Sequence, residues 1–239
     1  MKNLCLLGLG AFLVACSSSP LASDAGGAGA GGAAQFTSMC TAARATALGA
    51  NDSVSSGAVS VVSNSAGVTT LYVDATAGGM TDAAMNPWIF VSLDSGSKVA
   101  VTDLSSVDST AWDLALKRAQ IYTNSGDGGP GSGGAMLLDK AFDDVTRADA
   151  ADATFVPETF FDGDCNPNIE MATGALYTSF VDWYAYDEGT HVLTPAAGSY
   201  VVRGATGKLY KLVFENYYAT PTGAMGSASA EYLMKYEAL

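Results

Sequence analysis

The chain contains a single histidine, His191, in a stretch rich in aromatic residues. Imidazole is the usual side chain for proton transfer and metal ligation near neutral pH, so a catalytic triad or a histidine-ligated metal within one chain would have to use it. Trp183, Tyr184 and Tyr186 precede it, and Gly189 marks a turn. The segment is either a binding site with aromatic walls, or a strand and turn in which imidazole satisfies the backbone and the aromatic rings fill the core.

A second constellation suits a hard cation. Oxygen-bearing side chains occupy every second position of one short segment, namely Asp162, Asp164, Asn166, Asn168 and Glu170. Alternate residues of a curled loop point inward, as in calcium-binding loops, but Pro167 replaces the glycine of the EF-hand pattern and Thr173 replaces its bidentate acid. Asp and Asn also favour turns. The segment is therefore a candidate calcium site or a plain turn-rich loop.

Enzymatic motifs are missing from the sequence. It has no Gly-x-Ser-x-Gly, His-Glu-x-x-His or Cys-x-x-Cys motif. The Gly-rich stretch at residues 126–134 lacks the Gly-Lys-Ser/Thr ending of a phosphate-binding loop, so we expect it to serve close backbone approach instead. One catalytic arrangement remains possible, namely a pair of carboxylates that are distant in sequence and meet in the folded protein, as in glycosidases. We expect the protein not to be an enzyme.

Composition narrows the function classes further. The chain of 239 residues carries 24 acidic and 11 basic side chains, a formal charge of −13. Nucleic-acid binding relies on clustered Lys and Arg, so we expect no nucleic-acid partner. With 49% hydrophobic and 15% charged residues, the sequence predicts one folded domain with a real core rather than a disordered acidic chain.

The N-terminus looks like an export signal. Lys2 precedes an apolar run at residues 4–14, and residues 13–16 (LVAC) resemble the lipobox of bacterial lipoproteins. The resemblance implies cleavage before Cys16, acylation of that cysteine and anchoring in the outer membrane; an ordinary signal peptide cut elsewhere is the alternative. We therefore expect a signal peptide at 1–15, a lipidated flexible Ser/Ala/Gly tether at 16–35, and a folded domain at 36–239.

Two cysteines then remain for a disulfide. If Cys16 is lipidated and Cys5 is removed, Cys40 and Cys165 are left in an oxidising compartment, where a bond between them is the economical pairing. Two free buried thiols are the alternative.

The elements expected in the domain are mostly strands. Residues 36–48 are the one expected helix, because apolar residues recur there at helical spacing. β-branched or alternating segments separated by turn residues predict hairpins and strands at 59–62 with 68–73, 88–93 with 98–101, 112–117, 200–203 with 209–214, and 230–236. In residues 112–117 the alternation predicts one buried face. The fold class expected is all-β and mainly antiparallel, with at most this short N-terminal helix.

Two blocks of unusual residues resemble a known family. The first is residues 112–118 (WDLALKR), followed by 121–124 (IYTN) and the Gly-rich stretch. The second combines 200–203 (YVVR), 207–208, 210–212 and 217–218 with a closing strand that ends at Tyr236. Their order and spacing resemble the HmuY family of bacterial haem-binding lipoproteins. The resemblance implies a mostly β fold, a surface lipoprotein, and capture of haem for delivery to a TonB-dependent outer-membrane receptor.

The resemblance also implies candidate haem ligands, although this chain departs from the family pattern. The type member uses two histidines, and relatives use methionines. One histidine forbids a bis-histidine site in a monomer, so the expected ligands are His191 with a methionine, or two methionines. The candidates are Met171 and Met136, with Met225 a weaker third, and Trp183, Tyr184 and Tyr186 are expected as aromatic walls.

The shortage of histidine leaves a second function open. A surface lipoprotein of the same fold that no longer binds haem would act as a structural, adhesive or glycan-contacting module. Haemin titration discriminates between the two functions.

Overall fold

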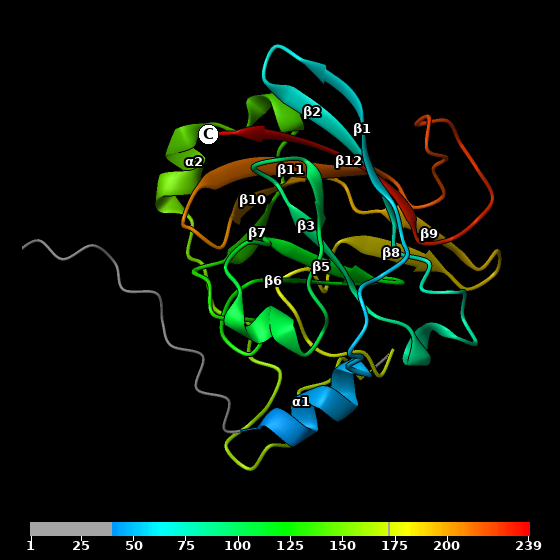
Figure 1. Ribbon diagram of the computed structural model, residues 1–239. Coiled ribbons are helices and arrows are strands. Elements are labelled where there is room, and N and C mark those ends of the chain that lie inside the picture. Colours follow the sequence, from blue (N-terminus) through cyan, green and yellow to red (C-terminus); the bar gives the residue numbers. More distant parts are fainter. Residues whose placement is uncertain (1–39, 172) are drawn as a thin grey trace, which may run out of the picture. The chain divides into compact units, whose positions relative to one another are not determined.

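The computed structural model describes residues 40–171 and 173–239, so the predicted signal peptide, Cys16 and the tether lie outside the described residues. The domain is built from antiparallel strands in three sheets, with two short helices beside them (Figure 1). The α-helices are α1 Thr41–Leu48 and α2 Arg147–Asp152. The strands are β1 Val59–Ser65, β2 Val68–Asp74, β3 Ile89–Ser92, β4 Ser97–Val99, β5 Leu114–Lys117, β6 Gln120–Thr123, β7 Gly134–Leu138, β8 Tyr184–Asp187, β9 Val192–Pro195, β10 Ser199–Arg203, β11 Leu209–Asn216 and β12 Glu231–Ala238. The all-β, mainly antiparallel fold class is thus confirmed.

The largest sheet has six strands in the order β1-β2-β12-β11-β10-β7, and every neighbouring pair is antiparallel. Successive side chains of a strand point to opposite faces. In β12 the buried residues Tyr232, Met234 and Tyr236 therefore pack on the main core, while Leu233 packs on the other face with Tyr72. This alternation is the one that the sequence predicts for residues 230–236.

The second sheet, β4-β3-β5-β6, is covered on both faces. One face, with Leu114 and Leu116, shares the main core with the six-stranded sheet. The opposite face, with Ala115 and Tyr122, packs in a second cluster that includes Leu48 of α1. The prediction that residues 112–117 have one buried face is therefore wrong: all of β5 is buried, because α1 and the segment near residue 160 cover the face that alternation assigns to solvent.

Most predicted elements are found at their expected places. The first hairpin turns at Ala66 and Gly67, and its strands run slightly longer than predicted. The predicted helix is present as α1, which ends at Gly49 in the left-handed conformation (φ 54°) that favours glycine. Two strands and one α-helix lie outside our predictions. The strands are β6, which pairs with β5, and the edge strand β7, which follows the Gly-rich stretch. The helix is α2, whose first turn is closed by a capping box between Thr146 and Asp149.

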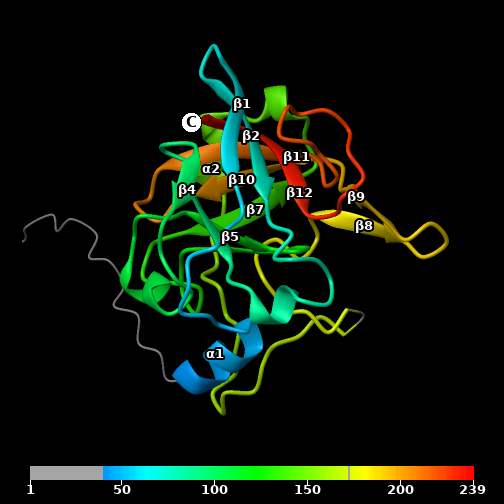
Figure 2. The same ribbon diagram turned by 45° about the vertical axis from the view of Figure 1, so that its right-hand side comes forward.

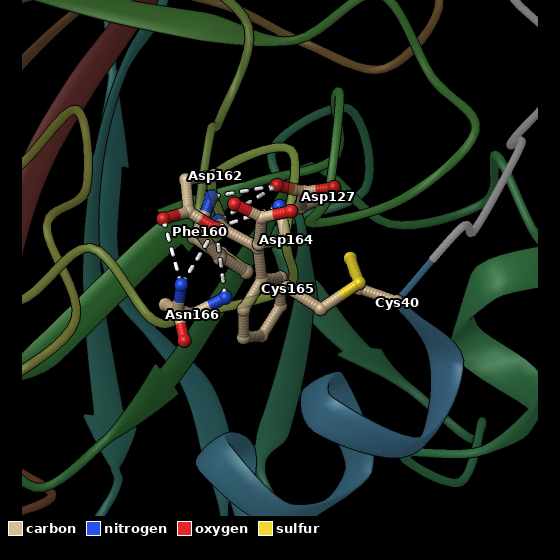
Figure 3. Close-up of a disulfide and its surroundings, with 8 residues drawn as sticks. Cys40, Asp127, Phe160, Asp162, Asp164, Cys165 and Asn166 are labelled. Atoms are coloured by element: carbon tan, nitrogen blue, oxygen red, sulfur yellow. Dashed lines mark hydrogen bonds between the residues drawn. A yellow bond between two sulfur atoms is a disulfide. The ribbon is translucent and has the colours of Figure 1, made fainter.

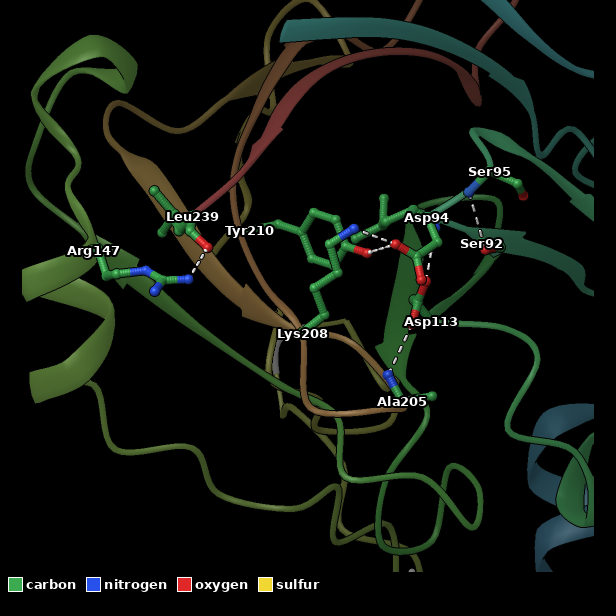
Figure 4. Close-up of polar contacts among 10 residues, drawn as sticks. Ser92, Asp94, Ser95, Asp113, Arg147, Ala205, Lys208, Tyr210 and Leu239 are labelled. Carbon is green, nitrogen blue, oxygen red and sulfur yellow. Dashed lines mark hydrogen bonds and ion pairs between the residues drawn. The ribbon is translucent and has the colours of Figure 1, made fainter. Parts of the chain in front are cut away.

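Asp113 links the two large sheets and joins the first sequence block to the second (Figure 4). Its Oδ2 accepts the N–H of Leu93 at 2.7 Å, and its Oδ1 accepts the N–H of Ala205 at 2.8 Å, in the turn between β10 and β11. A Cβ at Gly204 would lie 2.5 Å from the same Oδ1, so this turn needs glycine. Burial raises the pKa of Asp113, and the two N–H groups oppose that rise.

The Gly-rich stretch wraps around a buried side chain. The amide of Asn124 donates to the carbonyl oxygens of Ser109 and Trp112, both at 2.8 Å, and its Oδ1 accepts the N–H of Gly131 at 2.9 Å. A Cβ at Gly129 would lie 2.3 Å from that Oδ1. The stretch therefore serves close backbone approach, as the sequence predicts.

Candidate functional site

A cavity of about 730 Å³ lies where four distant parts of the chain meet. Its walls come from residues 46–49 at the end of α1, from residues 83, 84 and 88, from residues 117–121 at the turn between β5 and β6, and from Glu170 with residues of the segment 173–186. Its volume falls within the range of roughly 300–1,000 Å³ that is usual for small-molecule sites. Its lining residues include aromatic, charged and apolar side chains, among them Leu48, Lys117, Arg118, Glu170, Asp182, Trp183, Tyr184 and Tyr186. The cavity is the candidate functional site because it brings together all three predicted aromatic wall residues.

Trp183 forms the inner aromatic wall. Its side chain is 1% exposed, and its Nε1 donates to the carbonyl oxygen of Ala119 at 2.8 Å. Tyr184 packs beside it, with ring centroids 4.8 Å apart, and Phe214 packs behind it at 5.1 Å. Burial, with the nearby Glu170 carboxylate, raises the pKa of Tyr184. The two alternatives for these aromatics therefore coexist: Trp183 fills core, and it also closes one side of the cavity.

The hairpin β8–β9 carries the outer residues of the site. Tyr186 is 51% exposed, and its Oη lies 2.6 Å from Nδ1 of His191. His191 sits in the turn with φ 58°, and its N–H donates to the carbonyl oxygen of Asp187 at 2.8 Å. Figure 2 shows this hairpin extending away from the large sheets. The predicted strand, turn and returning strand is confirmed, and His191 is joined to the cavity through Tyr186.

The methionines are dispersed. Met171 follows Glu170, a cavity-lining residue, and its side chain is 88% exposed. Met136 pairs with Val201 in the six-stranded sheet, on the face opposite to Leu137 and the main core. Met225 is exposed in the loop before β12, and its sulfur accepts from Nδ2 of Asn216 at 3.3 Å. Of these three candidates, Met171 is the one that lies next to a wall residue of the cavity, and Met136 is separated from the cavity by the sheet.

The structure adds two basic lining residues that sequence reasoning missed. Nζ of Lys117 donates to the carbonyl oxygens of Leu48 and Gly49 at 3.2 and 3.4 Å, and burial lowers the pKa of this amine. Arg118 has φ 54°, and its guanidinium binds Oγ of Ser229 at 2.6 Å. These two adjacent cations line the cavity together with the carboxylates Glu170 and Asp182. The signal was the Lys-Arg pair that closes the first sequence block.

The candidate calcium loop is organised by its own hydrogen bonds (Figure 3). Oδ1 of Asp162 accepts the N–H groups of Asp164 and Asn166, both at 2.9 Å, and its Oδ2 accepts Nδ2 of Asn166 at 3.0 Å. Within the described residues, no three His, Cys, Asp or Glu side chains are placed to hold a metal ion. Calcium is therefore not supported as a cofactor. Asp and Asn alternate in this segment, which continues through Asn168 to Glu170, because their side chains favour turns by bonding to nearby backbone groups.

The predicted disulfide is present in the same loop. Cys40, just before α1, is bonded to Cys165 with an S–S distance of 2.03 Å and a sequence separation of 125 residues (Figure 3). The bond ties α1, whose end lines the cavity, to the segment that precedes the lining residue Glu170. Among the described residues, no helix is both long enough and apolar enough to cross a bilayer.

Comparison with known proteins gives one family match. The HmuY protein family matches residues 84–232, which is more than half of the chain. A search of curated proteins gives no match. Several solved structures are similar, including the following three. A candidate lipoprotein of Bacteroides fragilis is 16% identical (TM-score 0.46; 74% of this chain, 92% of that one). A candidate HmuY-like haem-binding protein of Bacteroides vulgatus is 17% identical, with a TM-score of 0.42, and the match covers 75% of this chain and 96% of that one. The apo HmuY analogue of Tannerella forsythia is 15% identical, with a TM-score of 0.44, and the match covers 72% of this chain and 95% of that one.

Proposed function

The chain belongs to the HmuY family, and from this membership we propose that it binds haem and has no catalytic role. The observation that carries the proposal beyond family membership is the cavity of about 730 Å³, which is lined by aromatic residues and by the cations Lys117 and Arg118 and has a phenol–imidazole pair at the hairpin.

The donor set of the cavity fits haem chemically. The flat apolar macrocycle suits the rings of Trp183 and Tyr184, which contact each other in the wall. The two carboxylates of haem would pair with the cations Lys117 and Arg118, which line the cavity. The iron accepts imidazole, thioether or phenolate ligands, and His191 and Met171 remain the candidate ligands nearest to the cavity walls. When bound, haem supplies the iron; the chain supplies walls, charge and donor atoms.

We further propose the cellular role that the family resemblance implies. The protein would be anchored in the outer membrane through acylated Cys16, capture haem, and pass it to a TonB-dependent receptor. Mass spectrometry of the purified protein tests the anchor, because a diacylglycerol and an N-acyl group on Cys16 change the mass of the N-terminal peptide. A Cys16→Ser variant that fractionates with the membrane like the wild type would contradict lipid anchoring.

Haemin titration of the purified protein tests the proposal itself. We expect a saturable Soret shift at micromolar protein under oxidising or reducing conditions. No saturable shift in either state would contradict haem binding and favour the alternative, a structural, adhesive or glycan-contacting lipoprotein of the same fold. If haem binds, His191→Ala and Met171→Ala test the two candidate ligands, and Met136→Ala, on the far face of the sheet, serves as the control.

A further inference from the structure

We infer that Tyr186 ligates the haem iron through Oη and that His191 holds this oxygen in position. The inference rests on the proposed haem binding and names the residue that would meet the metal. It assigns to Tyr186 a role that its residue type alone did not predict, since the sequence suggested only an aromatic wall.

Position on β8 distinguishes Tyr186 from the other tyrosine of the hairpin. Tyr184 and Tyr186 lie two residues apart on one strand and both line the cavity. Tyr184 is partly buried against Trp183, whereas Tyr186 is 51% exposed. Tyr186 thus both lines the cavity and is half exposed, and its hydroxyl is the donor atom that it offers to an entering ligand.

The hydroxyl is also held in place. Oη of Tyr186 lies 2.6 Å from Nδ1 of His191. The histidine sits in a closed turn, because Oδ1 of Asp187 accepts the N–H groups of Gly189 and Thr190 at 2.8 and 3.0 Å. Ligand atoms on strands, supported by a second hydrogen-bonded residue, give the most precise metal sites. Tyrosine is an established axial ligand of haem iron.

The other candidate ligands are less well placed. Met136 is on the opposite face of the six-stranded sheet, and Met171 is 88% exposed and not part of the cavity wall. His191 is not a wall residue either, and its Nδ1 is already engaged by Tyr186. Ligation by Nε2 of His191 is the competing arrangement, and the experiment below separates the two.

Ligation to ferric haem exchanges the phenol O–H bond for an O–Fe bond without electron transfer. The released proton passes to solvent, which reaches the half-exposed Tyr186. His191 is a positioning residue that acts through Tyr186.

Resonance Raman and absorption spectra of the ferric haem complex test the inference. The wild-type complex should show a phenolate-to-iron charge-transfer band with enhanced tyrosinate modes, and Tyr186→Phe should lose both. His191→Ala should keep the band but shift it and weaken haemin binding roughly 10- to 100-fold, as loss of a hydrogen-bonded partner does. His191→Gln, which restores a hydrogen bond, should recover part of that loss.

Two matched variants control for nonspecific effects. Tyr177→Phe removes the hydroxyl of a tyrosine that is similarly exposed (53%) and does not line the cavity, and it should leave the spectrum unchanged. Tyr184→Phe removes the neighbouring wall hydroxyl and should retain the charge-transfer band. Near-ultraviolet circular dichroism of each variant verifies the fold. The charge-transfer band of the wild-type complex is itself a test of the inference, and this measurement does not depend on any variant.

The outcomes separate this inference from the proposed function. A saturable Soret shift without a tyrosinate band, or a band that survives in Tyr186→Phe, overturns the Tyr186 assignment and leaves haem binding intact. A low-spin signal lost in His191→Ala but kept in Tyr186→Phe overturns it in favour of Nε2 ligation. No Soret shift in the wild type contradicts haem binding itself.

Discussion

Oγ of Ser179 donates a hydrogen bond of 2.6 Å to Oε1 of Glu158, a carboxylate that is 3% exposed. The same carboxylate accepts the N–H of Ser179 at 3.0 Å and both the N–H and Oγ1 of Thr123, at 2.8 and 2.9 Å. Thr123 ends β6, while Ser179 lies between the cavity-lining residues Thr178 and Phe180. Glu158 therefore joins the four-stranded sheet to the cavity wall.

We expect Glu158→Ala to destabilise the domain by about 3 kcal/mol or more, because four donors lose their acceptor and each buried unsatisfied group costs about 1–3 kcal/mol. Haemin affinity should fall as well, since the cavity wall loses its attachment. Chemical denaturation and haemin titration measure the two effects. Glu188→Ala, at an exposed site in the β8–β9 turn, is the control. Equal stability of the two variants would show that Glu158 does not hold the wall.

Removal of the disulfide should lower the free energy of unfolding. The Cys40–Cys165 bond closes a long loop, with a sequence separation of 125. Cross-links stabilise proteins typically by about 2–4 kcal/mol, in the chain-entropy account by restricting the unfolded chain. We therefore expect a loss of that size in the Cys40→Ser, Cys165→Ser double variant, measured by urea denaturation. A reductant should lower the wild-type midpoint to that of the variant and leave the variant unchanged; a reductant effect of equal size on both would exclude the disulfide as its cause.

The local patterns of the fold were predictable from the sequence, and its long-range burial was not. The turn at Ala66 and Gly67 and the alternation in β12 follow from turn chemistry and period-2 patterning. Neither pattern shows that α1 covers the second face of β5, because this depends on contacts between distant segments. The capping box of Thr146 and Asp149, at the spacing typical of a helix start, was a local signal for α2 that was available and not used.

The site was predictable in part for the same reason. The aromatic segment could be recognised as a candidate wall from residue types alone, and its strand and turn from Gly189. Periodicity cannot show that Leu48, Lys117 and Tyr186 meet at one cavity, because they come from three distant segments. Nor does it show that His191 faces a phenol, which depends on the register of one short hairpin.

Asp103 should titrate well above an ordinary aspartate. Burial raises its pKa from 3.8 to about 6, although the N–H groups of Asn51 and Trp88 oppose the rise. The native state therefore binds this proton more tightly than the unfolded chain does, so the contribution of Asp103 to the free energy of unfolding declines as the pH rises from 3.8 to about 6. Carboxyl NMR should find the midpoint near that upper value.

The variant Asp103→Asn is the control for this titration. Its side chain has no carboxyl group, so the decline in stability over that pH interval should become shallower than in the wild type. A native-state midpoint at or below 3.8, the ordinary value, would contradict the assignment of a buried, destabilised carboxylate.

Gly129→Ala tests the packing of the Gly-rich stretch on Asn124. The added methyl would lie 2.3 Å from Oδ1 of Asn124 and 2.8 Å from the ring of Trp112, so the buried amide has to move away from the N–H of Gly131. Overpacking of this kind costs about 1–3 kcal/mol. Gly163→Ala is the matched substitution in open space, where no atom lies within 4 Å, and it should change stability by less than about 0.5 kcal/mol. Thermal denaturation of both variants measures the difference. If the two variants have the same melting temperature, glycine at residue 129 is not required for the close approach to Asn124. Close packing on Asn124 would then not explain the glycine at this position of the Gly-rich stretch.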